Sequence, residues 1–171
     1  MNIELPDYAK DIQLNLSSLF RAGGTPGLDS AILYGTALAS AIASGNAAFA
    51  RTVEEAATQN ADVATIKAAK SAAAIMGMNN IYYRFLHLVE DKEYGTMPAK
   101  LRMNGLRGHG IDQKDFELFS LAVSAVNGCG LCLTAHEHEL KQAGVSREAV
   151  QSAVRVAAVF HAAAKVLAYE A

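Results

Sequence analysis

The sequence predicts an all-α protein, and three features of its 171 residues support this prediction. Hydrophobic residues make up 51% of the chain, and many are alanine, the residue with the lowest free-energy cost in a helix. Proline is rare, and no segment alternates apolar and polar residues as a half-buried strand would. A chain of this length buries roughly 70% of its unfolded surface, so we expect one compact multi-helix domain spanning residues 1–171.

The first half of the chain predicts four helices, divided by residues that interrupt or cap helices. The Gly-rich stretch 23–27 and the Gly45-Asn46 pair end the first two helices, because glycine favours helix C-termini. Asp62 is a favourable N-cap for a long fourth helix that extends toward His87. The expected ranges are 6–22, 28–44, 46–58 and 62–87.

The second half predicts three more helices after an irregular segment. Glycines and a proline accumulate between residues 91 and 110, where the helical periodicity fades. This segment is either a linker between two helical halves or a loop over a site. Asn127-Gly128 closes the first of the following helices, and Ser146 caps the last. Their expected ranges are 112–126, 129–144, and 146 almost to the end of the chain.

The only two cysteines form the motif Cys129-Gly130-Leu131-Cys132. Two thiols at this spacing close a disulfide with almost no loop, so the bond can open and close reversibly. Cys129 directly follows Asn127-Gly128, and we expect it in the first helical turn, where free N–H groups and the helix dipole stabilise a thiolate. At about 100° per residue, His136 shares a helical face with both cysteines. These three residues form one candidate redox unit.

Other interpretations of the cysteine pair remain open from spacing alone. A structural zinc site needs two more ligands, but His136 and His138 point about 200° apart on a helix and cannot easily both join the thiols. His87, His109 or His161 could complete such a site, although we expect His87 and His109 to be exposed and His161 to lie in a core or interface. The pair could also be buried and inert. A thioredoxin-like site is excluded because no strand precedes the motif.

Glu117 is a candidate acid–base group on the predicted helix 112–126. It lies among mostly apolar residues and shares a face with Ser120, Leu121 and Ser124. A partly buried carboxylate at this place could exchange a proton with a thiol directly, through His136 or through water. The alternative is a solvated acid in the first helical turn, which the helix dipole favours.

Charge and hydropathy exclude several classes of function. The net charge of −2 and pI of about 6.2, without a dense run of Lys or Arg, give no electrostatic basis for nucleic-acid binding. Residues 1–10 lack a secretory signal core, and polar residues interrupt the apolar stretches, so we expect no membrane span and a cytoplasmic location. Helices 62–87 and 146 onward are apolar on more than one side, which indicates a subunit interface.

The combination Glu117-x11-Cys129-x2-Cys132-x3-His136 resembles the alkyl hydroperoxide reductase D (AhpD) proteins, which belong to the carboxymuconolactone decarboxylase-like superfamily. The resemblance covers nearly the whole chain. Other similar segments are residues 8–12, 14–18, 74–80, 101–104, 124–129 and 135–138.

The resemblance implies an all-helical homotrimer with dithiol peroxidase activity toward alkyl hydroperoxides and no bound cofactor or metal. It implies that lipoyl groups are the external reductant, delivered by a lipoylated dihydrolipoyl acyltransferase with dihydrolipoamide dehydrogenase. Electrons are further expected to pass to an AhpC-type peroxiredoxin. By the same motif, Cys132 becomes the sulfenic acid, Cys129 donates a proton and then resolves it as a disulfide, and Glu117 and His136 relay protons.

Leu131 departs from the family pattern, in which histidine often precedes the second cysteine. The missing imidazole is expected to weaken thiolate stabilisation or to alter partner contacts, while the core set of four residues remains. The helix dipole favours Cys129 as the more acidic thiol, whereas the family pattern assigns peroxide attack to Cys132. Both hold if Cys129 ionises through Glu117 and His136 and then deprotonates Cys132.

Rival functions follow from the same residues. A decarboxylase-type lyase on this fold would use His136 and Glu117 without thiol chemistry. A redox sensor or a zinc-binding adaptor would use the cysteines without turnover. Within the redox interpretation, the chain could serve chiefly as an electron carrier to a peroxiredoxin, with direct peroxide removal secondary.

Overall fold

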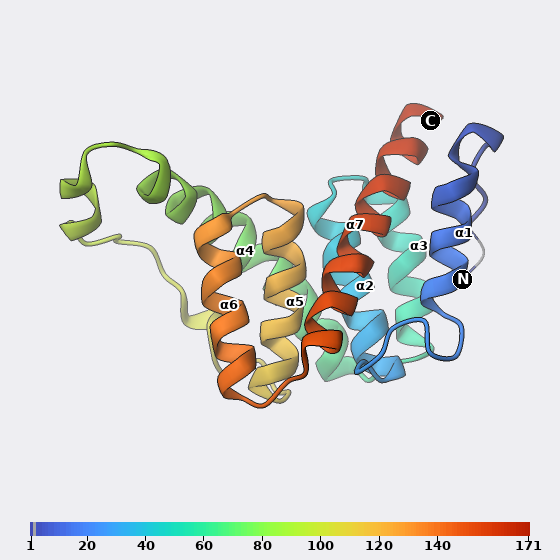
Figure 1. The fold of residues 1–171 in the computed structure, drawn as a ribbon, viewed down its shortest axis with the longest axis horizontal. Helices are drawn as coiled ribbons and strands as arrows, with labels where there is room; N and C mark the ends of the chain where they lie inside the picture. The colour runs from blue at the N-terminus through green and yellow to red at the C-terminus, as the bar shows by residue number, and fades with distance from the viewer. Residues whose placement is uncertain (2) are drawn as a thin grey trace.

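The computed structural model describes residues 1 and 3–171, and within them every regular element is helical, which confirms the predicted fold class (Figure 1). Seven α-helices are joined by mostly short connections, with three short 3₁₀ turns at Asp7–Ala9, Lys92–Thr96 and Asn104–Leu106. The α-helices are α1 (Lys10–Leu19), α2 (Ser30–Ala43), α3 (Ala47–Thr58), α4 (Val63–Leu88), α5 (Gln113–Val126), α6 (Gly130–Gln142) and α7 (Arg147–Tyr169).

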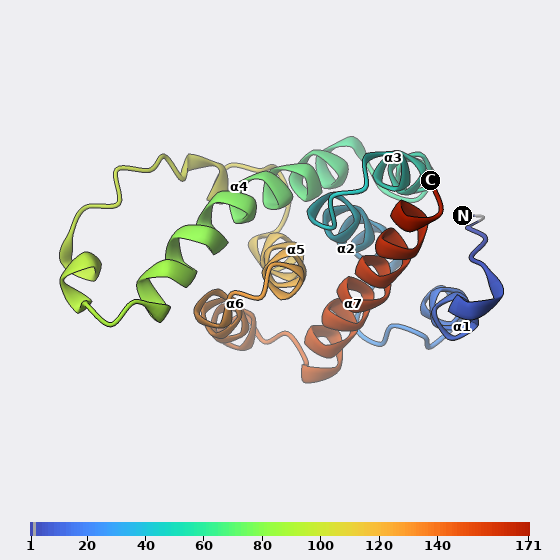
Figure 2. The same ribbon diagram turned by 90° about the horizontal axis from the view of Figure 1, so that it is seen from above.

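Helix α2 occupies the centre of the bundle, where it packs against α3, α4, α5 and α7 (Figure 2). Small residues on α2 allow these close approaches, because a helix that is buried on several sides has little room for bulky side chains. Helix α5 is the second buried helix, and it separates α2 from α6. The largest fully buried side chains include Leu38, Phe116, Phe119, Val156 and Phe160. The α5–α6 pair therefore stands on a rigid core.

Side-chain caps set the helix starts where the sequence predicts them. The carboxylate of Asp62 accepts a hydrogen bond from the backbone N–H of Thr65, and the Ser146 hydroxyl accepts one from Ala149. Asn46 caps α3 in the same way. The second helix is slightly shorter than predicted, because Asp29 acts as its N-cap and the helix begins at Ser30.

The segment between α4 and α5, residues 89–112, extends away from the bundle and then returns along α4 (Figures 1 and 2). The outer part is anchored by Tyr94, whose ring lies edge-on to Phe85 with centroids 5.3 Å apart. The returning part supplies Met103, Leu106 and Arg107 to a pocket that α5 and α6 also line. The segment is therefore a loop over the site, one of its two predicted interpretations.

Helix α7 is long and apolar enough to cross a membrane by length and composition. Its apolar face is buried in the bundle, however, where Val156 and Phe160 pack into the core and α2, α5 and α1 lie against it. A core helix of a globular protein is expected to have such a buried apolar face. Its apolar character is thus explained by packing within this chain.

Candidate functional site

The turn between α5 and α6 places the first cysteine. Gly128 adopts a positive φ of 67°, the left-handed conformation in which glycine meets no steric penalty, and this ends α5. Cys129 then becomes the N-cap of α6, one position earlier than the predicted first helical turn. Its Sγ accepts a hydrogen bond from the backbone N–H of Cys132 at 3.3 Å. The sulfur thus lies at the positive end of the α6 dipole.

Cys129 and Cys132 form a disulfide, with Cα atoms 5.3 Å apart. The two cysteines are not equally accessible: Cys129 is fully buried, whereas Cys132 is 7% exposed and borders the pocket. A reagent that arrives through the pocket therefore meets Cys132.

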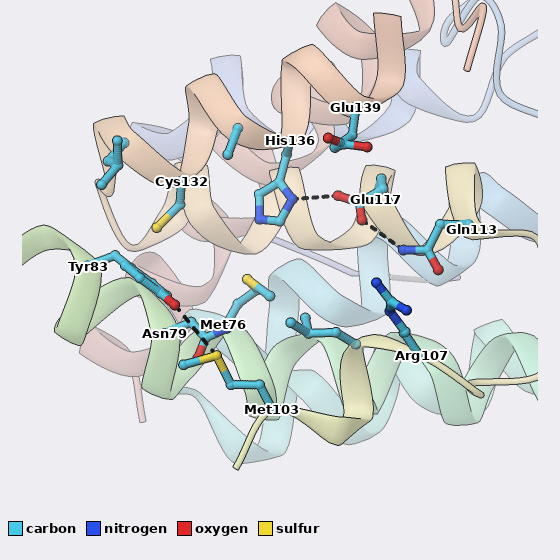
Figure 3. A pocket seen from close by; sticks show the side chains of 13 residues that line it. Met76, Asn79, Tyr83, Met103, Arg107, Gln113, Glu117, Cys132, His136 and Glu139 are labelled. Carbon is cyan, nitrogen blue, oxygen red and sulfur yellow. Dashed lines mark hydrogen bonds and ion pairs between the residues drawn. The ribbon is translucent and has the colours of Figure 1, made fainter. Parts of the chain in front are cut away.

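Glu117 and His136 are in direct contact. Oε2 of Glu117 lies 2.6 Å from Nδ1 of His136, and the two side chains are only 15% and 13% exposed (Figure 3). Burial alone would raise the pKa of the Glu117 carboxyl, but the hydrogen bond and charge of His136, together with a hydrogen bond from Gln113, hold it below its ordinary value. Glu117 is thus a partly buried, ionised carboxylate and not the solvated acid of the alternative interpretation.

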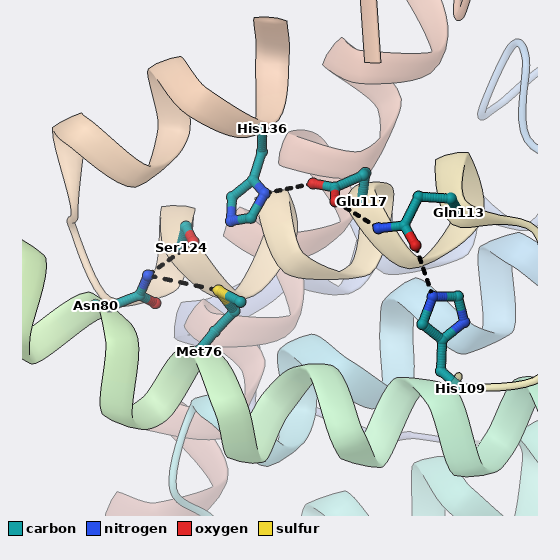
Figure 4. Close-up of polar contacts among 7 residues, drawn as sticks. All are labelled: Met76, Asn80, His109, Gln113, Glu117, Ser124 and His136. Atoms are coloured by element: carbon teal, nitrogen blue, oxygen red, sulfur yellow. Dashed lines mark hydrogen bonds and ion pairs between the residues drawn. The ribbon is translucent and has the colours of Figure 1, made fainter. Parts of the chain in front are cut away.

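The contact continues beyond the predicted residues. The Nε2 amide group of Gln113 donates to Oε1 of Glu117 at 2.8 Å, and Oε1 of Gln113 lies 3.0 Å from Nε2 of His109 (Figure 4). The prediction that His109 is exposed is wrong: its ring stacks on Phe116 with centroids 4.2 Å apart, and its Nδ1 is buried. Gln113 lies one helical turn before Glu117, a spacing that sequence can reveal. The position of His109 depends on the path of the long loop.

These residues line a pocket of about 720 Å³ between α4, α5, α6 and the returning loop. Cys132, His136 and Glu117 follow one wall, while the opposite wall is largely apolar (Figure 3). A volume of this size is typical of a small-molecule site. The lining residues are Met76, Asn79, Tyr83, Met103, Leu106, Arg107, Gln113, Glu117, Leu131, Cys132, Ala135, His136 and Glu139.

A buried polar network fixes the start of α6. Asn80 of α4 donates through Nδ2 to the Ser124 hydroxyl at 2.9 Å (Figure 4). Its Oδ1 accepts a hydrogen bond from the Asn127 amide, also at 2.9 Å. Arg84 donates to the backbone carbonyl of Asn127. Because buried polar groups need partners, these bonds tie the loop before Cys129 to α4. The Asn80 amide thus joins helices of one chain.

The zinc interpretation finds no support in the geometry. Within residues 1 and 3–171, no group of three or more His, Cys, Asp or Glu side chains is arranged to hold a metal ion. His87 and His138 are exposed, and His161 lies 3.3 Å from the Ser44 hydroxyl in a partly buried position. Burial, helped by the charge of Lys165, lowers the pKa of His161. His161 is therefore partly buried and does not lie in the core of this chain, and an interface position stays a prediction.

Comparisons with known proteins place the chain among these reductases. The sequence profile of the Carboxymuconolactone decarboxylase family matches residues 92–171. The chain is 56% identical over 168 residues to the alkyl hydroperoxide reductase AhpD of Maricaulis maris, covering 98% of this chain and 95% of that protein. It is 54% identical over 167 residues to AhpD of Hyphomonas neptunium, with 98% and 91% covered. Against AhpD of Brucella canis the identity is 50% over 161 residues, with 94% and 90% covered. Identity of this extent over almost the whole of both chains shows that this protein belongs to the AhpD group of the carboxymuconolactone decarboxylase family.

Proposed function

We propose that this protein reduces alkyl hydroperoxides with its Cys129–Cys132 dithiol and is then regenerated by dihydrolipoyl groups. One observation carries the proposal: the disulfide presents a single sulfur, that of Cys132, to an apolar pocket whose polar wall holds a carboxylate–imidazole pair. The names of the AhpD relatives, all alkyl hydroperoxide reductases, agree with this chemistry.

In the reduced protein, the Cys132 thiolate attacks the distal oxygen of the hydroperoxide. An S–O bond forms, the O–O bond breaks, and the alkoxide leaves with a proton, so that the products are a sulfenic acid and an alcohol. The His136–Glu117 pair is a proton store that lines the same pocket as Cys132. His136 donates or accepts the proton, and Glu117 holds the imidazole in place and stabilises its charged form.

The Cys129 thiol then displaces the hydroxyl group of the Cys132 sulfenic acid. The S–S bond forms, and the oxygen leaves as water once it has taken the proton of Cys129. Cys129 suits this resolving role because it is fully buried and adjacent, so peroxide does not reach it. Its place at the α6 N-terminus favours its thiolate. Acidity and accessibility thus fall on different cysteines.

Reduction of the disulfide also begins at the accessible cysteine. A dihydrolipoyl thiolate entering the pocket attacks the accessible Cys132 sulfur, forms a mixed disulfide and releases Cys129; the second lipoyl thiol then completes the exchange. No bound cofactor takes part. We propose a lipoylated dihydrolipoyl acyltransferase with dihydrolipoamide dehydrogenase as the source of electrons, and an AhpC-type peroxiredoxin as a further acceptor. A reducing compartment suits this cycle, so we propose a cytoplasmic location.

The test is peroxide turnover with dihydrolipoamide as reductant. We expect turnover in the wild-type protein and none in Cys132→Ser. Cys129→Ser should also fail to cycle, but it should form one sulfenic acid on Cys132, detected by mass spectrometry after trapping. Sustained turnover by Cys132→Ser, or a sulfenic acid on Cys129 in place of Cys132, would contradict the assignment of roles.

A further inference from the structure

We propose that His109 and Gln113 are positioning residues that hold the Glu117 carboxylate in the orientation needed to serve His136. This inference rests on the proposed function, since it concerns the same proton relay. It extends the chain of contacts around Glu117 from two residues to four, across α6, α5 and the returning loop (Figure 4).

Both oxygens of the Glu117 carboxylate are occupied. Oε2 faces His136 at 2.6 Å, and Oε1 accepts from the Gln113 amide at 2.8 Å. Rotation of the carboxylate about its last side-chain bond would break both of these hydrogen bonds, so the bond from Gln113 adds to the cost of rotation. Gln113 therefore fixes the plane in which Glu117 meets the imidazole.

His109 in turn fixes which end of the Gln113 amide faces Glu117. The Nε2 of His109 is 3.0 Å from the Gln113 Oε1, so the ring donates there and the amide N–H₂ group must point to the carboxylate. Without this donor, the exposed Gln113 side chain keeps only its hydrogen bond to Glu117. Stacking on Phe116 at 4.2 Å with planes only 5° apart holds the ring. Its other nitrogen, Nδ1, is buried with no hydrogen-bond partner, so the bond to Gln113 is the one that the ring makes.

The charged groups around Glu117 set the expected direction of a pH effect. His136 faces it from α6, His109 acts through Gln113, and Arg107 and Glu139 line the same pocket. The hydrogen bond from Gln113 and the charge of His109 both act to lower the pKa of Glu117, against burial, which raises it. Removing either residue removes one of the contributions that lower the Glu117 pKa, while burial still raises it. The carboxyl should therefore protonate at a higher pH.

His109 lies on the same loop segment as part of the pocket wall. The returning loop that carries His109 also supplies Met103, Leu106 and Arg107 to the pocket wall. The wall that a ligand contacts and the outer end of the relay are thus parts of one segment. The contacts that orient Gln113 therefore depend on this segment lying against α5.

Two variants remove the contacts while keeping the shapes. Gln113→Leu removes the amide, and His109→Phe keeps the stack on Phe116 but removes the donor. The matched control is Lys114→Ala, which removes an exposed side chain from the neighbouring position of α5. The double variant tests the order of action: if His109 acts through Gln113, adding His109→Phe to Gln113→Leu should change the rate by less than His109→Phe does alone.

Two readouts separate this inference from the proposed function. The first is the ¹³Cδ signal of Glu117 followed by NMR against pH, which needs no turnover. The second is the pH profile of peroxide turnover with dihydrolipoamide. We expect both single variants to move the Glu117 titration and the acid limb of the profile to higher pH, with a several-fold loss of rate on the acid limb that is recovered at neutral pH. Lys114→Ala should match the wild type.

The outcomes are distinct. An unchanged Glu117 titration and pH profile in both variants, with an active wild-type protein, would overturn the positioning role while leaving the proposed function intact. An inactive wild-type protein, whose Glu117 titration nevertheless moves in the variants, would overturn the proposed function and leave the four-residue contact standing. A uniform loss of rate at all pH values, with an unmoved titration, would show only a folding defect and would also contradict the inference.

Discussion

The sulfurs of Cys129 and Cys132 differ in what stabilises them and in what can reach them. Cys129 caps α6 and is fully buried, whereas Cys132 lies one turn along and borders the pocket. A helix N-terminus favours a thiolate, but a thiolate that no peroxide reaches cannot be the attacking group. The helix dipole favours Cys129 as the more acidic thiol, and the family pattern assigns peroxide attack to Cys132. Both hold if the two cysteines have different roles. Leu131, 41% exposed at the pocket rim, offers no imidazole, so His136 and Glu117 are the acid–base groups present beside the thiols.

Glu117 and His136 should each be required for rate but not for folding. We expect Glu117→Gln and His136→Ala to lower peroxide turnover by about 10²-fold, a typical contribution of a positioned acid–base group. Circular dichroism should show an intact helical fold, because both side chains lie at the pocket wall and not in the core. Wild-type rates in both variants would make the pair structural.

The same pair makes a pH-dependent contribution to stability. Because the pKa of Glu117 is lowered in the folded protein, its contribution is present above the ordinary carboxyl pKa and is lost as the pH falls through the folded pKa. The difference in melting temperature between wild type and Glu117→Gln should accordingly be largest near neutral pH and should shrink in acid. A difference that grows toward low pH would contradict the sign.

At the scale of elements, the contact between α2 and α5 depends on one glycine. A methyl group at Gly35 would collide with the ring of Phe119, which is fully buried and has no room to move. Gly77, in the middle of α4, has open space around it. We expect Gly35→Ala to destabilise the protein by about 1–3 kcal/mol through overpacking, despite the better helix propensity of alanine. Gly77→Ala should stabilise it by about 0.5–1 kcal/mol.

Urea unfolding at one fixed chain concentration measures both changes, and each variant is the control for the other. The higher helix propensity of alanine acts alike at both sites. Opposite changes in stability would therefore be due to the collision of the new methyl group with Phe119. If Gly35→Ala were as stabilising as Gly77→Ala, the helices would not be as close as the structure has them.

The elements themselves were largely predictable, because their ends depend on local chemistry. Asp62, Asn46 and Ser146 cap helices through hydrogen bonds to backbone groups three residues away, and such signals are legible in the sequence. The spacing of Glu117, Cys129, Cys132 and His136 likewise predicted a common site, and the structure brings all four together.

The contacts of the loop were not predictable in the same way. His109 was expected to be exposed because it lies in an irregular, Gly-rich stretch, yet tertiary packing stacks it on Phe116. The apolar wall that Met103 and Leu106 form depends on the return path of residues 89–112 along α4. The path of this loop is determined by the whole fold, and the local sequence periodicity does not predict it.

At the scale of the whole molecule, the last turns of α4 present an apolar face that this chain does not cover. Ile81, Phe85 and Leu88 recur at helical spacing and are 59%, 46% and 70% exposed. Met97 and Leu101, on the protruding loop, are exposed as well. Contiguous exposed apolar side chains mark interaction surfaces, and α4 is one of the two helices that the sequence marks for a subunit interface. We propose that this face is buried in a homotrimer.

The assembly can be tested by one substitution on this face. Light scattering should give the wild type a mass near three times the 18.1 kDa of one chain, and Phe85→Lys should lower it, because a charge cannot be buried there without a partner. Leu14→Lys is the control, since Leu14 is a similarly exposed side chain, 54%, on the distant α1. A monomeric wild type at micromolar concentration would reject the oligomer. A trimer that survives Phe85→Lys but not Leu14→Lys would place the interface on α1 instead, and the apolar end of α4 would then require a different partner.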